Sequence, residues 1–277
     1  MARLVHRAFA VLRALNEGPA NLNSLHEQTD LHRATLLRIL DALIQEGMVR
    51  RAVGGDTYHL KHCVKLLGRK ISKTDLLAEA ASEHLQSYSS LVRWPTDVLH
   101  LHATQPCLVV AETNRPGSPF PVKPNRIRHT IPLVPSAAGR AYLAFMKKSR
   151  RDHLLRKAER LGYFLQSPHI NLEHLEEDLN VVRQKGYGTR ANFFRGGDYL
   201  EMRIENDGLL ALAVPVLNGP DLIAVLNTQW NAKAYDEAGF SSRYLAGQIE
   251  LAAAIAADFQ RLEREKTLPE SLHDFTE

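Results

Sequence analysis

The chain has 277 residues, 44% hydrophobic and 24% charged, as in an ordinary globular protein of about two domains. This composition argues against intrinsic disorder, and no apolar run approaches the length of a membrane-spanning helix. A formal charge of +4 and a pI near 9.1 favour a nucleic-acid partner only weakly. Cys63 and Cys107 match no metal or redox spacing, so we expect inert thiols in a reducing cytoplasm.

The first sixty residues predict a winged helix-turn-helix unit. Apolar residues recur with helical period from Val5 to Leu15, and the sequence Asn16-Glu17-Gly18-Pro19 ends that helix. Residues 21–60 then predict a short helix, a turn, a second amphipathic helix and a hairpin around Gly54-Gly55-Asp56. On the second helix, which Gly47 ends, one apolar stripe is expected to contain Leu36, Leu37, Leu40, Leu43 and Ile44.

The opposite face of this second helix carries the residue types that suit a DNA major groove. Small and hydroxyl groups permit close approach, and arginine can bind guanine edges or phosphates. The hairpin adds two arginines that can reach a neighbouring phosphate. The predicted DNA-binding residues are therefore His32, Arg33, Thr35, Arg38, Arg50 and Arg51. The alternative is a small helical bundle with a solvated basic face, because helix-turn-helix patterns also occur in protein-interaction domains.

A helical pattern follows over residues 61–90, with an apolar stripe that is narrow for a deep core. We expect a linker helix at 63–82 that also pairs subunits. The alternative is that this segment is simply the first helix of the larger domain.

From Asp97 the apolar period changes to that of strands, followed by helices, a hairpin and a closing helix. Helices are expected at 137–146, 151–161 and 172–185, a hairpin at 209–230, and a long helix at 241–264. This mixture predicts an α+β fold. The expected domains are a DNA-binding unit at 1–62, a sensor-like domain at 83–265 and a flexible tail at 266–277.

Four segments carry a resemblance to a known family, in order and at matching spacing: DLHRATLLRILDALIQEGMV, IPLVPSAAGRAYLAFM, KGYGTRANFF and GLLALAVPVLNGPDLIAVLNTQ. The second is the most specific, with Pro132-Leu133, the small-residue turn Ser136 to Arg140 and an Ala- and Leu-rich helix. Over essentially its whole length the chain resembles the IclR family of bacterial transcription regulators. Within that family it is most similar to activators of aromatic-acid catabolism.

The resemblance implies a winged helix-turn-helix dimer on an operator, with RNA polymerase as an indirect partner, and often a tetramer formed as a dimer of dimers. It also implies a GAF-like (profilin-like) domain that binds a small aromatic carboxylic acid, and no cofactor. The effector-binding residues it implies are Ala137, Ala138, Arg190, Leu209, Ala211, Asn227 and Gln229. Unpaired N–H groups in the first turn after Ser136 suit a carboxylate. Asn227 and Gln229, two apart on one strand, point the same way.

The chain departs from the family after its Gly-Tyr motif, where many members carry acidic residues. Here residues 189–195 contain Arg190, Phe193 and Phe194. One hypothesis is that Arg190 clamps the effector carboxylate with two hydrogen bonds and a phenylalanine lies against its ring. The alternative is a solvated loop arginine.

Other chemistry is weakly indicated. His100 and His102 alternate on one strand, so a zinc site is conceivable, but no paired cysteine or carboxylate spacing accompanies them and none is expected. The sequence contains no nucleophile elbow, phosphate loop or paired carboxylates, so an enzyme is not expected. Two alternatives remain. One is an enzyme acting on a small carboxylate with an N-terminal interaction module, and the other is a ligand-independent architectural DNA binder.

Overall fold

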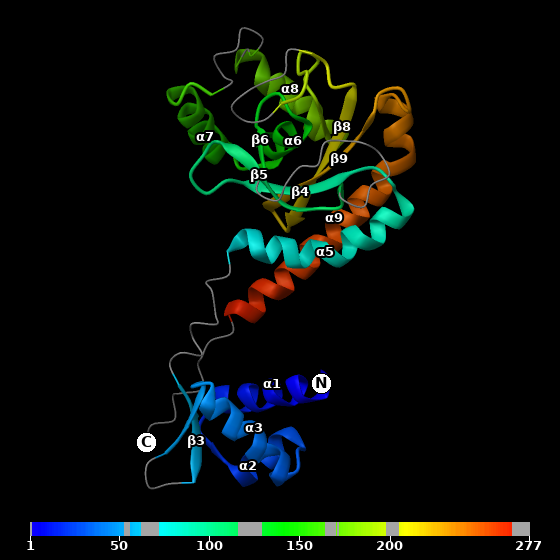
Figure 1. Ribbon diagram of the computed structural model, residues 1–277. Coiled ribbons are helices and arrows are strands. Elements are labelled where there is room, and N and C mark those ends of the chain that lie inside the picture. Colours follow the sequence, from blue (N-terminus) through cyan, green and yellow to red (C-terminus); the bar gives the residue numbers. More distant parts are fainter. Residues whose placement is uncertain are drawn as a thin grey trace. The chain divides into compact units, whose positions relative to one another are not determined.

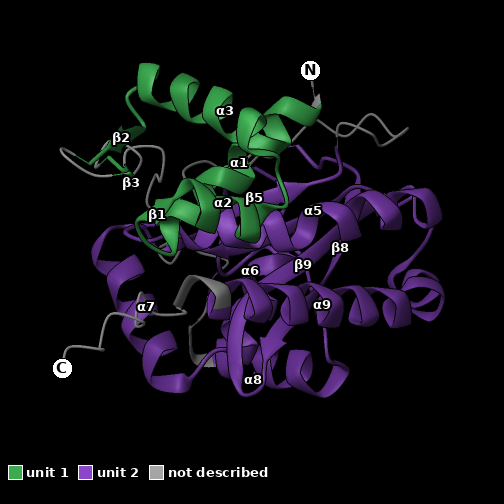
Figure 2. Ribbon diagram, turned by 90° about the horizontal axis from the view of Figure 1, so that it is seen from below, with its two compact units in different colours: residues 1–71 green, residues 72–277 purple. Residues whose placement is uncertain are grey.

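The computed structural model describes residues 2–52, 56–61, 72–115, 129–163, 170, 172–197 and 205–267. The chain divides into two compact units, residues 1–71 and residues 72–277, which are described separately (Figures 1 and 2). None of the described helices combines the length and apolarity that crossing a membrane requires.

Unit 1 has the predicted helix-turn-helix followed by a hairpin. Strand β3 lies between β1 and β2, and both pairs are antiparallel. The elements are α1 (Ala2–Asn16), β1 (Ala20–Asn21), α2 (Leu22–Thr29), α3 (Arg33–Gln45), β2 (Val49–Arg51) and β3 (Thr57–Leu60). Gly54 and Gly55 of the predicted turn lie outside the described residues.

Local polar contacts fix where the helices of unit 1 begin and end. The Asn21 side chain caps α2 by accepting hydrogen bonds from the backbone N–H groups of Asn23 and Ser24. Asp30, at φ +54°, ends α2 in the left-handed conformation and donates its N–H to the His26 carbonyl. This sharp stop lets the chain reverse before α3 begins at Arg33.

The apolar stripe predicted for α3 is partly wrong. Leu36, Leu40 and Leu43 are buried as expected, but Leu37 and Ile44 are 42% and 37% exposed. Ile39 is buried instead, which moves the centre of the stripe toward the side that packs against α1, α2 and β2. An ideal helical wheel gives the period of a stripe but not the direction from which neighbouring elements cover it.

Unit 2 is a six-stranded sheet between two layers of helices. All adjacent strands pair antiparallel, in the order β6-β5-β4-β9-β8-β7. Helices α5 and α9 pack on one face, and α6, α7 and α8 lie over the other (Figure 1). The strands are β4 (Thr96–Leu101), β5 (Cys107–Thr113), β6 (Thr130–Pro132), β7 (Gly188–Thr189), β8 (Leu209–Asn218) and β9 (Asp221–Asn231). The helices are α5 (Lys73–Leu91), α6 (Ala137–Phe145), α7 (Lys148–Arg160), α8 (Leu172–Lys185) and α9 (Glu237–Thr267).

Helix α5 differs from the predicted linker. Its residues Leu77, Ala81 and Leu85 are buried in one hydrophobic core with Ile255 and Phe259 of α9. The stripe therefore does reach a deep core, and residues 73–82 belong to the first helix of the larger unit, the alternative drawn from the sequence. Residues 62–71, which begin the predicted linker, lie outside the described part of the chain, as do residues 268–277 of the predicted tail.

His100 of β4 faces α5, where its Nε2 lies 2.9 Å from the Thr74 hydroxyl oxygen. Burial and the nearby Lys73 charge lower the pKa of His100 from 6.5 to about 4. Between these values the unfolded chain binds a proton that the folded chain does not. We therefore expect unfolding free energy to fall by about 1.4 kcal/mol per pH unit between pH 6.5 and 4 through this group alone.

Urea denaturation at several pH values tests this expectation with His100→Asn and a control at the exposed His153. The slope below pH 6.5 should become shallower in His100→Asn and stay unchanged in His153→Asn. Equal slopes in wild type and His100→Asn would contradict the role given to His100.

Candidate DNA interface and effector site

The predicted DNA-binding residues all lie on α3 and β2 of unit 1. His32, Arg33 and Arg38 are exposed, and Thr35 is half-buried. His32 is the N-cap residue of α3, but its side chain forms no capping hydrogen bond, so its imidazole is not committed to the helix end. Arg50 and Arg51 are exposed on β2. The first turn of α3 contains no acidic residue, which leaves its positive dipole end and Arg33 available to a phosphate.

The predicted effector site begins at the first turn of α6. The Ser136 hydroxyl donates to the Pro132 carbonyl at 2.5 Å and accepts the Gly139 N–H at 2.9 Å. Ala137 and Ala138 are each 1% exposed, and within the described residues no atom accepts a hydrogen bond from their backbone N–H groups. These two donors at the positive end of a helix suit a carboxylate.

Two glycines let α6 approach its neighbours this closely. A Cβ at Gly139 would lie 1.9 Å from the Leu133 carbonyl oxygen, which is far inside any permitted contact. A Cβ at Gly188 of β7 would lie 2.7 Å from both the Ala137 carbonyl oxygen and the Ala141 nitrogen. The start of α6 therefore rests directly on the backbone of β7.

From Gly188, one row of paired residues crosses the sheet through Ala213 and Asn227 to Asp97. Side chains alternate along β9, and Val225 packs in the core on the α6 side, so Asn227 and Gln229 face that side too. Asn227 is 4% exposed, and its amide forms no hydrogen bond with any residue that the structure describes. Its amide atoms are not among the fully buried polar atoms that lack a partner in the described residues, so they remain available, and this position is suited to receive a polar ligand atom.

Arg190 is neither free nor solvated. Its Nη1 donates to Asp207 Oδ1 at 2.7 Å and to the Leu209 carbonyl oxygen at 3.0 Å, and its side chain is only 10% exposed. Its guanidinium also lies 5.4 Å from the centre of the Phe194 ring. The alternative of a solvated loop arginine is therefore wrong. Leu209 is half-buried, and its backbone carbonyl holds Arg190.

A buried ion pair that the sequence did not predict lies on the same side of the sheet. Arg115 donates through Nε to Asp97 Oδ1 at 2.8 Å and through Nη2 to Asp97 Oδ2 at 2.6 Å. Both side chains are at most 1% exposed, and the Thr113 hydroxyl also donates to Asp97 Oδ1. The only signal in the sequence was an aspartate at an inward position of an alternating strand, and nothing indicated its partner.

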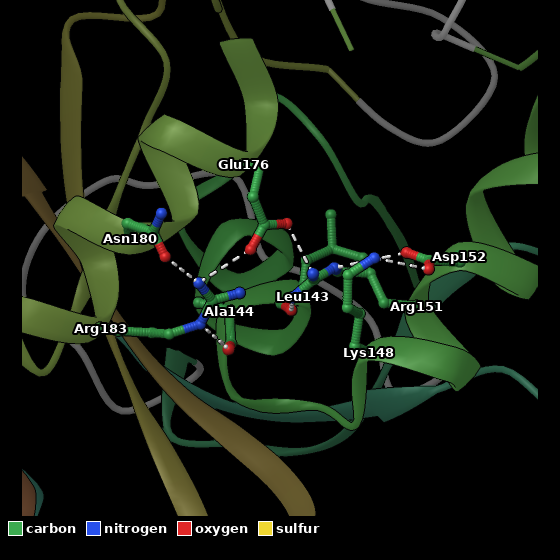
Figure 3. A network of polar contacts seen from close by, with 8 residues as sticks. All are labelled: Leu143, Ala144, Lys148, Arg151, Asp152, Glu176, Asn180 and Arg183. Carbon is green, nitrogen blue, oxygen red and sulfur yellow. Dashed lines mark hydrogen bonds and ion pairs between the residues drawn. The ribbon is translucent and has the colours of Figure 1, made fainter. Parts of the chain in front are cut away.

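The other end of α6 is held by a polar network (Figure 3). Arg183 donates to the Ala144 carbonyl at 2.7 Å, and Arg151 donates to the Leu143 carbonyl at 3.4 Å. Glu176 joins the two arginines, at 2.5 Å from Arg151 and 3.1 Å from Arg183. Positive charge at the last carbonyls of a helix is favourable. The network therefore helps to fix the helix whose first turn forms the candidate site.

Glu176→Gln should lower the unfolding free energy by about 1–2 kcal/mol because it removes the nearer carboxylate of the buried Arg151, which leaves only Asp152 at 4.0 Å. The loss stays below that of a fully buried pair since the Glu176 side chain is 48% exposed. Lys148→Gln is the control, because the Lys148–Asp152 pair in the same region is mostly exposed (Figure 3). Its loss in urea denaturation should be clearly smaller, and equal losses in the two variants would contradict the role given to Glu176.

The two histidines considered for zinc have separate roles. His100 pairs with Thr74, whereas Nδ1 of His102 accepts the backbone N–H groups of Thr104 and Gln105. The described part of the chain contains no cluster of three or more His, Cys, Asp or Glu residues arranged to hold a metal ion. Burial raises the pKa of the Cys107 thiol to about 12, which makes it a poor nucleophile. Cys63 lies outside the described residues.

Comparison with known proteins agrees with this architecture. A family model described as the HVO_A0261 N-terminal domain matches residues 1–63. The probable transcriptional regulator SauR of Cupriavidus necator is 25% identical over 224 residues, which cover 76% of this chain and 79% of that protein.

Two solved structures share the fold over nearly the whole chain. The IclR protein of Thermotoga maritima is 16% identical, with a TM-score of 0.53 over 94% of this chain and 99% of that one. An IclR homolog from Microbacterium hydrocarbonoxydans, solved with 4-hydroxybenzoate, is 19% identical, with a TM-score of 0.51 over 93% and 99%. The chain therefore has the α+β fold of IclR regulators, including their GAF-like domain. The name of the Cupriavidus relative describes a probable transcriptional regulator, which is the class of protein expected from the sequence.

Proposed function

We propose that this chain is a DNA-binding transcriptional regulator of the IclR family that responds to a small aromatic carboxylic acid. The observation that carries the proposal is that one chain contains both a candidate DNA-binding face and a candidate site for a carboxylate. Unit 1 exposes Arg33 and Arg38 on the second helix of a helix-turn-helix, and unit 2 has N–H donors at Ala137 and Ala138 that no described atom accepts.

On DNA, two copies of unit 1 place their α3 helices in successive major grooves about 34 Å apart, so the operator is a near-palindrome of that spacing. Thr35 and Arg38 approach base edges from α3, while His32 and Arg33 at its start and Arg50 and Arg51 on β2 contact phosphates. The working form is a homodimer or a dimer of dimers.

In unit 2, the effector carboxylate docks on the N–H groups of Ala137 and Ala138. This is supported by the Asn227 amide, for which no described residue is a hydrogen-bond partner, on the row of residues that begins beneath α6. Gln229 and the small Ala211 contact the ring or chain of the acid. Arg190 donates hydrogen bonds to the carboxylate through Nε and Nη2. Its partners among the described residues, Asp207 and the Leu209 carbonyl, both bind Nη1.

The effector class is supported by the relative solved with 4-hydroxybenzoate and by the sequence resemblance to aromatic-acid regulators. The acid binds one arrangement of the oligomer better than another, and a coupling of about 1–3 kcal/mol changes operator affinity or polymerase recruitment. We propose a cytoplasmic activator of an aromatic-acid catabolic operon, of the phenylpropanoid type.

Selection of duplexes from a random library with the full-length protein tests the proposal. Fluorescence anisotropy at about 150 mM salt should then give at least a thousandfold tighter binding to the selected near-palindrome than to random duplex. Equal, weak binding to both duplexes would refute sequence-specific DNA recognition.

A further inference from the structure

The row of residues beneath α6 ends at the ion pair between Asp97 and Arg115, which is neutral as a whole but strongly polar. Two strand steps separate Ala213, next to the start of α6, from Asp97. At about 4.8 Å per step this is about 10 Å, a length similar to that of a phenylpropanoid acid. A ligand that places its carboxylate on α6 and lies across Asn227 therefore brings its far end to the Asp97–Arg115 pair.

Among the described residues, two arginines on this side of the sheet are each paired with a carboxylate. Arg115 is neutralised by Asp97 at 2.6 Å, and Arg190 is neutralised by Asp207 at 2.7 Å. A further attraction for an anion comes from the α6 terminus, which is equivalent to about half a positive charge. A second carboxylate at the far end would be buried beside Asp97, and the one cation that the described residues place there, Arg115, is already paired with Asp97, which makes this strongly unfavourable.

The same end of the row can still form hydrogen bonds. The Asn227 amide offers both a donor and an acceptor, and no described residue accepts a hydrogen bond from Nη1 of Arg115. An uncharged oxygen on the ligand, above all a hydroxyl, can satisfy these groups. An unsubstituted apolar end would leave them without partners.

We propose that Asp97 and Arg115 are specificity-determining residues of the effector site. They restrict it to acids that carry a single negative charge and an uncharged, oxygen-bearing group at the opposite end. This inference rests on the proposed function. The ion pair determines which charge the far end of the ligand can carry. Asn227, next to the pair, supplies hydrogen bonds to an uncharged group.

Three acids of one skeleton test the inference: 3-phenylpropionate and its derivatives with a para hydroxyl or a para carboxylate. Isothermal titration of the full chain should give about tenfold tighter binding of the hydroxylated acid than of the unsubstituted one. The dicarboxylate should bind at least about a hundredfold more weakly than the hydroxylated acid. Equal affinities for all three would overturn the inference but leave the proposed function standing, whereas binding of none of them would overturn both.

Asp97→Asn uncovers the Arg115 charge, so this variant should gain affinity for the dicarboxylate and lose its preference for the hydroxylated acid. A dicarboxylate affinity that remains as weak as in wild type would count against the pair. Asn227→Leu, which leaves the ion pair intact, decides the matter if Asp97→Asn does not fold. It should abolish the preference for the hydroxyl without admitting the dicarboxylate, and an unchanged preference would overturn the inference.

Discussion

Gly139→Ala is expected to lower the unfolding free energy of the effector domain by about 3 kcal/mol and to abolish effector binding. The new methyl group would lie 1.9 Å from the Leu133 carbonyl oxygen and 2.4 Å from two more Leu133 backbone atoms. Backbone atoms cannot rotate away as a flexible side chain can. The turn before α6 must therefore shift, and with it the Ala137 and Ala138 donors.

Gly247→Ala in α9 is the matched control. Its Cβ would lie 3.9 Å from the nearest atom, on the Tyr88 ring, which is an ordinary contact. Alanine is favoured over glycine inside a helix, so this variant should gain about 0.5–1 kcal/mol. Urea denaturation followed by circular dichroism measures both variants. Similar stability changes in the two would refute the close approach at Gly139.

Arg38→Ala is expected to weaken operator binding by about ten- to a hundredfold, the value of a good arginine contact to a base edge. Binding to random duplex should change far less, because Arg38 lies in the middle of the exposed face of α3. Arg33→Ala at the helix start should instead weaken both duplexes similarly and reduce the salt dependence, as the loss of a phosphate contact does.

Arg13→Ala separates these contacts from a general effect of net charge. Arg13 is exposed in the last turn of α1 and carries the same charge, but it lies outside the predicted DNA-binding set. Anisotropy should show a change within about twofold for this variant. A loss as large as that of Arg38→Ala would mean that charge alone, and not the α3 face, determines operator affinity.

The sequence was sufficient for most elements of both units. Periodicity and end signals predicted α1, α2 and α3, and the β8–β9 hairpin, which turns at Gly219-Pro220, coincides with the hairpin predicted at 209–230. These features depend on contacts between residues close in sequence. For the same reason, the α6 segment could be predicted from its small-residue turn.

Features that depend on distant segments could not be predicted. Asp97 and Arg115 are neighbours only because β4 and β5 pair, and Arg190 meets Asp207 across a segment without helix or strand pattern. The burial of α5 requires α9, which follows it by about 150 residues. Periodicity predicts each helix but does not specify which helices pack together. The ion pair with Asp207 shows that Arg190 is not the solvated loop arginine that the sequence left open.

The most direct test of ligand-responsive DNA binding is the affinity of the full-length protein for its selected operator with and without saturating 3-(4-hydroxyphenyl)propionate. Random duplex and the matched acid without its ring hydroxyl are the controls. We predict that the acid changes operator affinity by at least about fivefold, and that operator changes the affinity for the acid by the same factor. Tight binding of both ligands with no change in either affinity would contradict the account.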